Sequence, residues 1–202
     1  TGKIPVNVDD LHVDMLSIAG HKFHGPKGVG ALYIRSGTAI NPLTFGGHQE
    51  NGSRAGTENV PGIVGLGKAC EIASRDLPYA MVMLKQLRDL LEAIIMHNIP
   101  DIKINGDPLC RVPHILSISI PGVAGDAVVR EMAARGIALS AGSACSSEST
   151  HISHVLAALG MPEELAKGTI RFSLGKGNNE EELIRAAGAL HEVIKDMRSK
   201  QG

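Results

Sequence analysis

Few features of this sequence point to a nucleic acid or a membrane as its partner. Its 20 basic and 21 acidic side chains give a formal net charge of -1 over 202 residues. A chain so nearly neutral has little electrostatic attraction for a polyanion or an anionic lipid surface, so we expect neither nucleic acid nor membrane as a partner. No apolar run reaches the roughly 18 to 20 residues that a membrane-spanning helix needs.

Cysteine and aromatic residues are scarce as well. Three cysteines without metal-type spacing argue against a disulfide framework and for a reducing compartment, so we expect a cytoplasmic location. Tryptophan is absent and aromatic residues make up only 2 %, which leaves few rings to stack on a flat ligand. The sequence does not begin with Met and opens in what resembles the middle of a strand-rich unit, so we expect it to be the C-terminal part of a longer protein.

One stretch near the start stands out, because an apolar run ends in His21-Lys22 and a glycine-rich turn at 25–28 follows. A lysine at the mouth of a buried strand, with glycines that let other backbone approach, is suited to amine chemistry. The turn is not a phosphate loop, since Pro26-Lys27 replaces the Gly-Lys-Ser/Thr of that motif. Most lysines are surface charges, so Lys22 becomes a candidate only together with a second motif.

That second motif is the run of small residues at 140–147. Cys145 lies there among alanine and serines that cannot shield it from solvent, after a glycine that can bend the loop, so its thiol is available as a nucleophile. The alternative for any cysteine is an inert small hydrophobe. We predict that role for Cys70 on the apolar stripe of a helix, and Cys110 is interpreted as an incidental loop cysteine.

Short apolar runs alternating with helical periodicity predict an α/β fold. The predicted strands are 11–18 and 30–34, both buried, then 102–105, 115–120, 137–140 and 169–174. Residues 42–59 are predicted to form a polar loop, and the Ile-Ser alternation at 115–120 indicates a strand with one face in water. Asp126 is expected to cap a helix that Gly136 ends, a short helix is predicted at 153–159, and the last helix begins near Asn179.

A long amphipathic helix is predicted to follow Pro61 and to be kinked or restarted near Pro78. Such an element joins two regions of different composition, which makes it a natural domain connector. We therefore place the domain boundary there, with domains at 1–77 and 78–202.

Taken together, the motifs resemble those of the pyridoxal-phosphate-dependent cysteine desulfurases, which belong to the class-V aminotransferases. Five signatures occur in the order of that family and span nearly the whole chain. They are the His-Lys pair, the Gly-Pro-Lys-Gly turn, and residues 54–57, 140–147 and 169–175. The small-residue loop around Cys145 is similar to the iron-sulfur-assembly branch rather than to the branch that includes selenocysteine lyases.

The resemblance implies the architecture of a fold-type-I pyridoxal-phosphate-dependent transferase, working as a homodimer. Residues 1–77 would be the C-terminal part of the large cofactor-binding domain, and 78–202 the connecting helix and the small α/β domain. Lys22 would bind pyridoxal phosphate as a Schiff base and carry a proton at the substrate carbon, which calls for a desolvated amine. His21 would hold the cofactor phosphate, and Thr57 would reach the phosphate of the neighbouring subunit's cofactor.

For the substrate, the resemblance implies that Arg171 grips the carboxylate of L-cysteine. Cys145 would attack the substrate sulfur, leaving L-alanine and a persulfide that passes to an acceptor protein, such as an iron-sulfur scaffold or a tRNA-thiolation protein. Two alternatives stay open, namely a non-catalytic fragment that only folds or docks on partners, and a selenocysteine lyase-like activity. A metal site is not expected, because the spacing of His21, His24, His48 and Cys145 matches no structural zinc pattern.

The sequence departs from the family's pattern at Ala19, where the family usually offers a hydroxyl two residues before the histidine. One contact to the cofactor phosphate is therefore not supplied at that position. The family's stacking histidine, its carboxylate at the pyridine nitrogen and its first phosphate loop all lie upstream of the lysine, and none of them can be assigned in this sequence.

Overall fold

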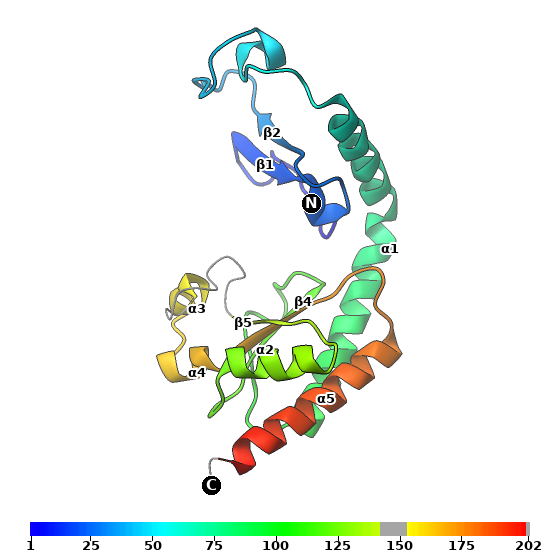
Figure 1. Ribbon diagram of the computed structural model, residues 1–202, viewed down its shortest axis with the longest axis vertical. Coiled ribbons are helices and arrows are strands. Elements are labelled where there is room, and N and C mark those ends of the chain that lie inside the picture. The colour runs from blue at the N-terminus through cyan, green and yellow to red at the C-terminus, as the bar shows by residue number, and fades with distance from the viewer. Residues whose placement is uncertain (142–152, 201–202) are drawn as a thin grey trace. The chain divides into compact units, whose positions relative to one another are not determined.

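The computed structural model describes residues 1–141 and 153–200, and it divides into two compact units, Thr1–Tyr79 and Ala80–Gly202. Helices and strands alternate along the chain (Figure 1), which confirms the predicted α/β class. In the described part of the chain, no helix combines the length and the apolar character needed to cross a membrane.

The first unit is built on an antiparallel hairpin. Strand β1 (Met15–Ala19) pairs with β2 (Gly30–Ile34), with Met15 opposite Ile34 and Ala19 opposite Gly30. The 3-10 helix η1 (Gly20–Phe23) follows β1 directly, and a second one, η2 (Gln49–Gly52), lies in the long loop after β2. The predicted first strand is too long at its start, because residues 11–12 lie in a turn and β1 begins only at Met15.

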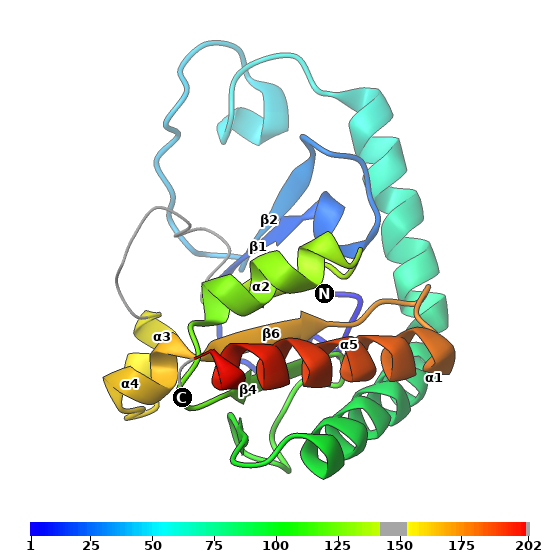
Figure 2. The same cartoon turned by 60° about the horizontal axis from the view of Figure 1, so that its bottom comes forward.

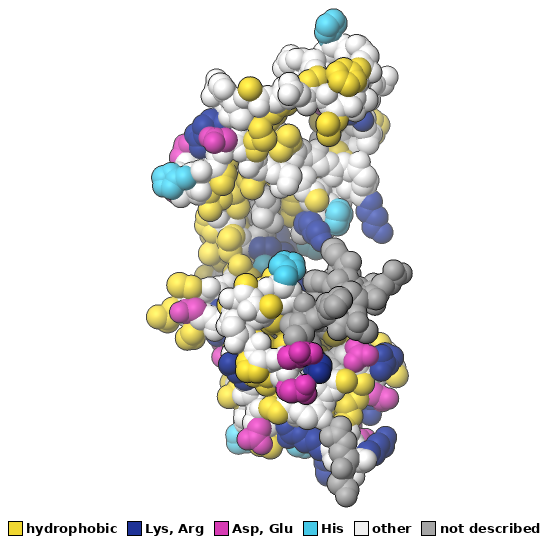
Figure 3. Space-filling view, turned by 90° about the vertical axis from the view of Figure 1, so that its left-hand side faces the viewer, with side chains coloured by type: hydrophobic (Ala, Val, Ile, Leu, Met, Phe, Trp, Pro, Cys, Tyr) yellow, Lys and Arg dark blue, Asp and Glu magenta, His cyan; other side chains and the backbone are white. Residues whose placement is uncertain are grey.

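The prediction that these two strands are buried is wrong. Neither strand contains a fully buried residue, and the buried core of this unit consists of Phe23, Leu66 and Ala69. A two-stranded ribbon presents two faces, and apolar composition alone does not reveal whether anything covers them. Several exposed apolar side chains of this unit are visible in Figure 3, and Leu43 and Phe45 are the most exposed at 97 % and 86 %.

Helix α1 (Val60–Asn98) is continuous over 39 residues and passes through Pro78 without a restart. A proline inside a helix lacks the N–H donor and its ring opposes the carbonyl four residues earlier, which together cost about 3 kcal/mol. Burial of Leu84, Leu87 and Leu91 in the following turns offsets that cost.

The predicted burial of Cys70 is also wrong, because its side chain is exposed. The face of α1 that packs in the first unit carries Leu66 and Ala69, and Ala73 packs at its edge. Cys70 lies about 40° from Leu66 and about 100° from Ala69 around the helix axis, so it is at the outer edge of this stripe.

The second unit contains a four-stranded antiparallel sheet in the order β3-β4-β6-β5. Its strands are β3 (Lys103–Ile104), β4 (Ile115–Ser119), β5 (Ser140–Ala141) and β6 (Thr169–Ser173). Its remaining helices are α2 (Gly125–Ala134), α3 (His154–Ala158), α4 (Glu163–Lys167) and α5 (Glu180–Ser199). Helix α2 packs on β5, β6 and α5. Figure 2 shows α2 beside β6 and α5.

One continuous hydrophobic core lies inside this unit. Its largest fully buried side chains come from α1, β4, α2, β6 and α5, or lie just after β4. They are Leu84, Leu91, Ile95, Leu116, Ile118, Ile120, Val128, Met132, Ile170, Leu190, Val193 and Ile194. A core drawn from five elements ties the sheet and helices of this unit into one cooperative body.

Several sequence predictions for this unit need correction. The prediction that one face of β4 lies in water is wrong at Ser119, which is fully buried. Residues 137–139, predicted to form a strand with Ser140, lie outside β5. Asp126 does not cap α2, because Ala124 occupies the N-cap and Asp126 instead pairs with Arg130 one turn later, at 2.8 Å. Helix α4 was not predicted at all.

The start of α5 near Asn179 is confirmed. Asn179 accepts a hydrogen bond from the Glu182 N–H at 2.9 Å, and the Glu182 carboxylate accepts one from the Asn179 N–H at 3.4 Å. This capping box satisfies two backbone donors that the helix end would otherwise leave unpaired.

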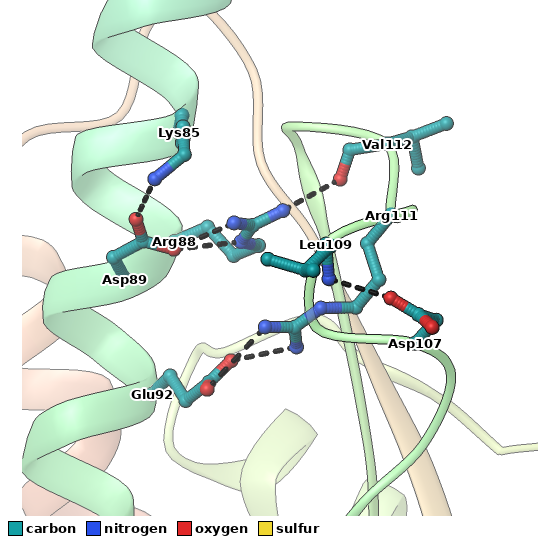
Figure 4. A network of polar contacts seen from close by, with 8 residues as sticks. All are labelled: Lys85, Arg88, Asp89, Glu92, Asp107, Leu109, Arg111 and Val112. Carbon is teal, nitrogen blue, oxygen red and sulfur yellow. Dashed lines mark hydrogen bonds and ion pairs between the residues drawn. The ribbon is translucent and has the colours of Figure 1, made fainter.

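A polar network fastens the loop between β3 and β4 to α1 (Figure 4). The Arg88 side chain is only 4 % exposed, and it donates to Asp89 Oδ1 at 2.6 Å and to the Val112 carbonyl at 3.0 Å. Lys85 donates to the other Asp89 oxygen at 2.6 Å, and Arg111 pairs with Glu92 at 2.7 Å. Burial raises the pKa of Asp89, but the hydrogen bonds from Lys85 and Arg88 outweigh it and leave the pKa below its usual value.

We expect Asp89→Asn to lower the free energy of unfolding by about 1–2 kcal/mol at neutral pH, because the buried Arg88 loses its ionic acceptor. The stabilisation by Asp89 is fully present above its unfolded-state pKa and is lost as the pH falls through the lower folded-state pKa. The free energies of unfolding in urea of the Asp89→Asn variant and the unsubstituted chain should therefore differ at neutral pH and converge in acid. The control is Asp126→Asn, whose exposed pair with Arg130 should change stability by less than about 0.5 kcal/mol. Equal losses in the two variants would contradict the special role of Arg88.

Candidate functional site

Lys22 lies in η1, where strand β1 ends. The turn around it is closed by the Gly20 N–H, which donates to the Val29 carbonyl at 2.9 Å, and by the Gly25 N–H, which donates to the Gly20 carbonyl at 2.9 Å. A Cβ atom at Gly25 would lie 2.9 Å from that same Gly20 oxygen. Glycine is thus required here by close backbone approach, as the sequence indicated.

The side chains of His21 and Lys22 are exposed, whereas Gly20 and Phe23 are buried. A 3-10 helix has three residues per turn, so Gly20 and Phe23 share the inward side and the two residues between them point outward. The desolvated amine that the resemblance calls for is therefore not provided by the described residues of this unit.

Thr57 lies in the same unit, in the loop that leads into α1, and its side chain is exposed. The loop is held by its own polar groups, since the Gly56 N–H donates to Gln49 Oε1 at 3.1 Å and the Arg54 guanidinium donates to the Gly56 carbonyl at 3.3 Å. This prediction of a polar, hydrogen-bonded loop over 42–59 agrees with the structure, apart from the short helix η2 inside it.

Arg171 lies in the second unit, on β6. Its neighbours Ile170 and Phe172 are buried at 0 % and 3 % exposure, so Arg171 faces the other side of the sheet and is half-buried. Its Nε atom is buried and has no hydrogen-bond partner. A buried guanidinium nitrogen without a partner is uncommon in proteins, although Arg111, which pairs with Glu92, has an unpaired buried Nε as well. The free donor of Arg171 is compatible with a site for an anionic group.

Cys145 lies outside the described residues. The two residues that end the described chain before it, Ser140 and Ala141, form β5 and pair with β6, with Ser140 directly opposite Arg171. The sequence did not predict this juxtaposition, because register between strands far apart in the chain leaves no local signal.

The structure thus assigns Lys22, His21 and Thr57 to the first unit, and Arg171 with the strand preceding Cys145 to the second. Within the described ranges, no group of three His, Cys, Asp or Glu side chains is placed to hold a metal ion. The chemical groups present are an exposed primary amine, an imidazole beside it, a hydroxyl and an arginine with a free buried donor.

Comparisons of the chain with family models and with curated proteins agree on one family. The family model described as Aminotransferase class-V matches residues 1–185. The chain is 48 % identical over 98 % of its length to cysteine desulfurase IscS of Dictyoglomus turgidum, covering 50 % of that protein. It is 46 % identical over 99 % of its length to a cysteine desulfurase of Sinorhizobium fredii, covering 52 % of it.

The fold agrees with this similarity. A solved structure described as a NifS-like protein superimposes with a TM-score of 0.85 at 40 % identity, covering 96 % of this chain and 50 % of that one. The chain spans about half the length of the curated relatives it matches.

We expect Arg171→Met to leave the free energy of unfolding within about 0.5 kcal/mol of the unsubstituted chain, because it removes a guanidinium with an unpaired buried donor. The matched variant is Arg88→Met, which removes a buried guanidinium that is fully paired and should cost about 1.5–3 kcal/mol. Urea unfolding measures both. A loss at Arg171 as large as that at Arg88 would identify Arg171 as a structural residue rather than one kept for a ligand.

Proposed function

Because the chain belongs to the class-V aminotransferase family, we propose that it is part of a cysteine desulfurase that converts L-cysteine to L-alanine and retains the sulfur as a persulfide on Cys145. The observation that carries the proposal is the similarity to relatives named cysteine desulfurase along nearly the whole chain. The unpaired donor of Arg171 adds independent physical support.

The residues of the first unit fit pyridoxal phosphate as donors. Lys22 offers a primary amine for covalent attachment, and the adjacent His21 offers a ring donor to the cofactor phosphate. In a homodimer, Thr57 would offer its hydroxyl to the phosphate of the cofactor bound by the partner subunit. Ala19 supplies no hydroxyl, whereas Ser17 lies exposed two residues earlier on β1. When bound, pyridoxal phosphate supplies an electron sink for bond breaking at the amino acid.

The role proposed for Lys22 beyond attachment is to hold and move a proton at the substrate carbon. This task requires the amine to be neutral during part of the cycle, and burial is the usual cause of that. Since Lys22 is exposed within its own unit, the shielding must come from whatever covers η1 in the complete enzyme.

Arg171 is proposed to orient the substrate through its carboxylate, because a planar guanidinium can donate two parallel hydrogen bonds to it. The opposing residue Ser140 belongs to the strand that leads to Cys145, so β6 carries the carboxylate site and fastens the chain that carries the nucleophile. A four-residue stretch spans at most about 14 Å, which limits the distance between the Cα atoms of Ala141 and Cys145.

The sulfur step balances without an external oxidant. The Cys145 thiolate attacks the substrate sulfur, a sulfur–sulfur bond forms, and the bond between that sulfur and the substrate β-carbon breaks. The electron pair of the broken bond stays with the carbon, which takes up a proton and leaves as the methyl group of alanine.

The persulfide is then available to a sulfur acceptor, for which the proposal names an iron-sulfur scaffold or a tRNA-thiolation protein. A homodimer in the cytoplasm, with the large cofactor-binding domain ending at residue 77 and the small domain at 78–202, completes the proposal. The name of the relative from Dictyoglomus turgidum supports the desulfurase activity.

Addition of pyridoxal phosphate to the purified chain is expected to produce an absorbance band at the edge of the visible range that borohydride reduction fixes to the Lys22 peptide. Lys22→Ala should lose both the band and the mass increase, whereas Lys27→Ala in the same turn, also exposed, should keep both. A chain that stays colourless with added cofactor would instead support the non-catalytic alternative.

In the cofactor-loaded enzyme, Cys145→Ser should keep the absorbance band and reduce sulfide release from L-cysteine by at least about a thousandfold, because serine cannot accept the sulfur. The controls Cys70→Ser and Cys110→Ser replace exposed thiols and should retain full activity. Full activity in Cys145→Ser would disprove the assigned nucleophile, and a comparison of L-cysteine with L-selenocysteine as substrates tests the lyase-like alternative.

A further inference from the structure

A cluster of buried polar side chains lies where β3, β4 and β6 come together at one end of the sheet. Asn105, Ser119 and Thr169 are 7 %, 0 % and 4 % exposed. The Ser119 and Thr169 hydroxyls lie 2.6 Å apart on strands that pair directly, and Asn105 Nδ2 donates to Ser119 Oγ at 2.9 Å. An unpaired buried hydroxyl is costly, so these groups depend on one another.

The cluster also reaches the connection between α3 and α4. Met161 lies in that connection, and its Sδ accepts from Ser119 Oγ at 3.4 Å and from Thr169 Oγ1 at 3.8 Å. Each hydroxyl has one proton, and the 2.6 Å contact uses one of the two. The remaining hydroxyl proton has two acceptors within reach in either case. They are Met161 Sδ and Asn105 Oδ1 at 3.2 Å if the proton belongs to Ser119, or Met161 Sδ and the Leu165 carbonyl at 3.5 Å if it belongs to Thr169.

Met161 is fastened to α3 as well. Its N–H donates to the Leu156 carbonyl at 3.1 Å, and Leu156 is the buried residue of α3. The Thr169 hydroxyl lies within 3.5 Å of the Leu165 carbonyl of α4. One end of β6 thus holds both short helices that follow the segment containing Cys145.

The other end of that segment is held by the same strand. Ala141 pairs with Ile170, the residue next to Thr169. The chain leaves β6 at Ala141 and returns to it through Met161, and Cys145 lies between these two points in the sequence.

From this arrangement we infer that Ser119, Thr169 and Met161 form a positioning site, which fixes the C-terminal attachment of the Cys145 segment to the sheet. These residues act through α3, and we assign them no contact with the substrate. The inference rests on the proposed function for the role of Cys145 as nucleophile, while the attachment itself is a property of the fold.

The variants that test it are Thr169→Val, which removes the hydroxyl at nearly constant volume, and Met161→Leu, which removes the sulfur acceptor. Thr169→Ser keeps the hydroxyl and is the matched control. Amide hydrogen exchange should become about three- to tenfold faster in α3 for the first two variants, since a net hydrogen bond of this kind is lost. The amides of α5 should be unaffected, and Thr169→Ser should behave as the unsubstituted chain.

A second measurement follows Cys145 itself. Nitroxide labels on Cys110 and Cys145, in a Cys70→Ala background, report their distance distribution by double electron–electron resonance. Cys110 is a suitable reference, because Arg88 and Arg111 fasten its loop to α1. The distribution should broaden in Thr169→Val and Met161→Leu, because α3, which follows the segment containing Cys145, is held less firmly to the sheet. Thr169→Ser should restore the original width.

Two results would overturn the inference. Equal acceleration of exchange in α3 and α5 would reduce the cluster to a contribution to general stability, and a distance distribution that is the same in all variants would show that it does not position Cys145. If Thr169→Val fails to fold, Met161→Leu carries the test. Neither measurement needs cofactor or substrate, so a failure of the desulfurase proposal would leave both readable.

Discussion

The pairing of β6 with two neighbours determines the structure of the second unit. It pairs with β4 over the whole strand and with β5 at Ile170 and Arg171, so its register fixes what lies on each face. Ile170 and Phe172 enter the core on one face, which leaves Arg171 on the other with its unpaired donor. A structural requirement, burial of two apolar residues, thereby places the arginine on the opposite face of the sheet.

The two units obtain their order by different means. The second has a continuous core from five elements, and its fully buried polar residues are hydrogen-bonded, as with Arg88 and Ser119. The first has a core of three residues and holds its shape through backbone hydrogen bonds in turns and through Arg35, which binds Asp9 at 2.6 Å and the Val13 carbonyl at 3.0 Å. An exposed amine at Lys22 follows from this thin core, because nothing in the unit is available to bury it.

Local signals in the sequence predicted much of the fold. The capping box at Asn179 and the apolar pattern of β6 are properties of consecutive residues, and both elements were placed to within one residue. The errors at Cys70, Ser119 and β1 share a cause. In each case the burial of the residue or strand depends on which distant segment of the chain packs against it. Motifs in the sequence identified Lys22, His21, Thr57 and Arg171 as candidates. The exposure of Lys22 and the position of Ser140 opposite Arg171 became clear only from the three-dimensional structure. The roles of these residues stay predictions.

The contact between the Ser119 and Thr169 hydroxyls also bears on how the sheet assembles. If β6 slipped by one residue against β4 during folding, the Thr169 hydroxyl would lose its contact with Ser119 and the Arg171 guanidinium would be forced toward the core. Such misaligned intermediates would be penalised before the helices close over the sheet. The hydroxyl pair thus favours the correct register of β4 and β6 over a register shifted by one residue.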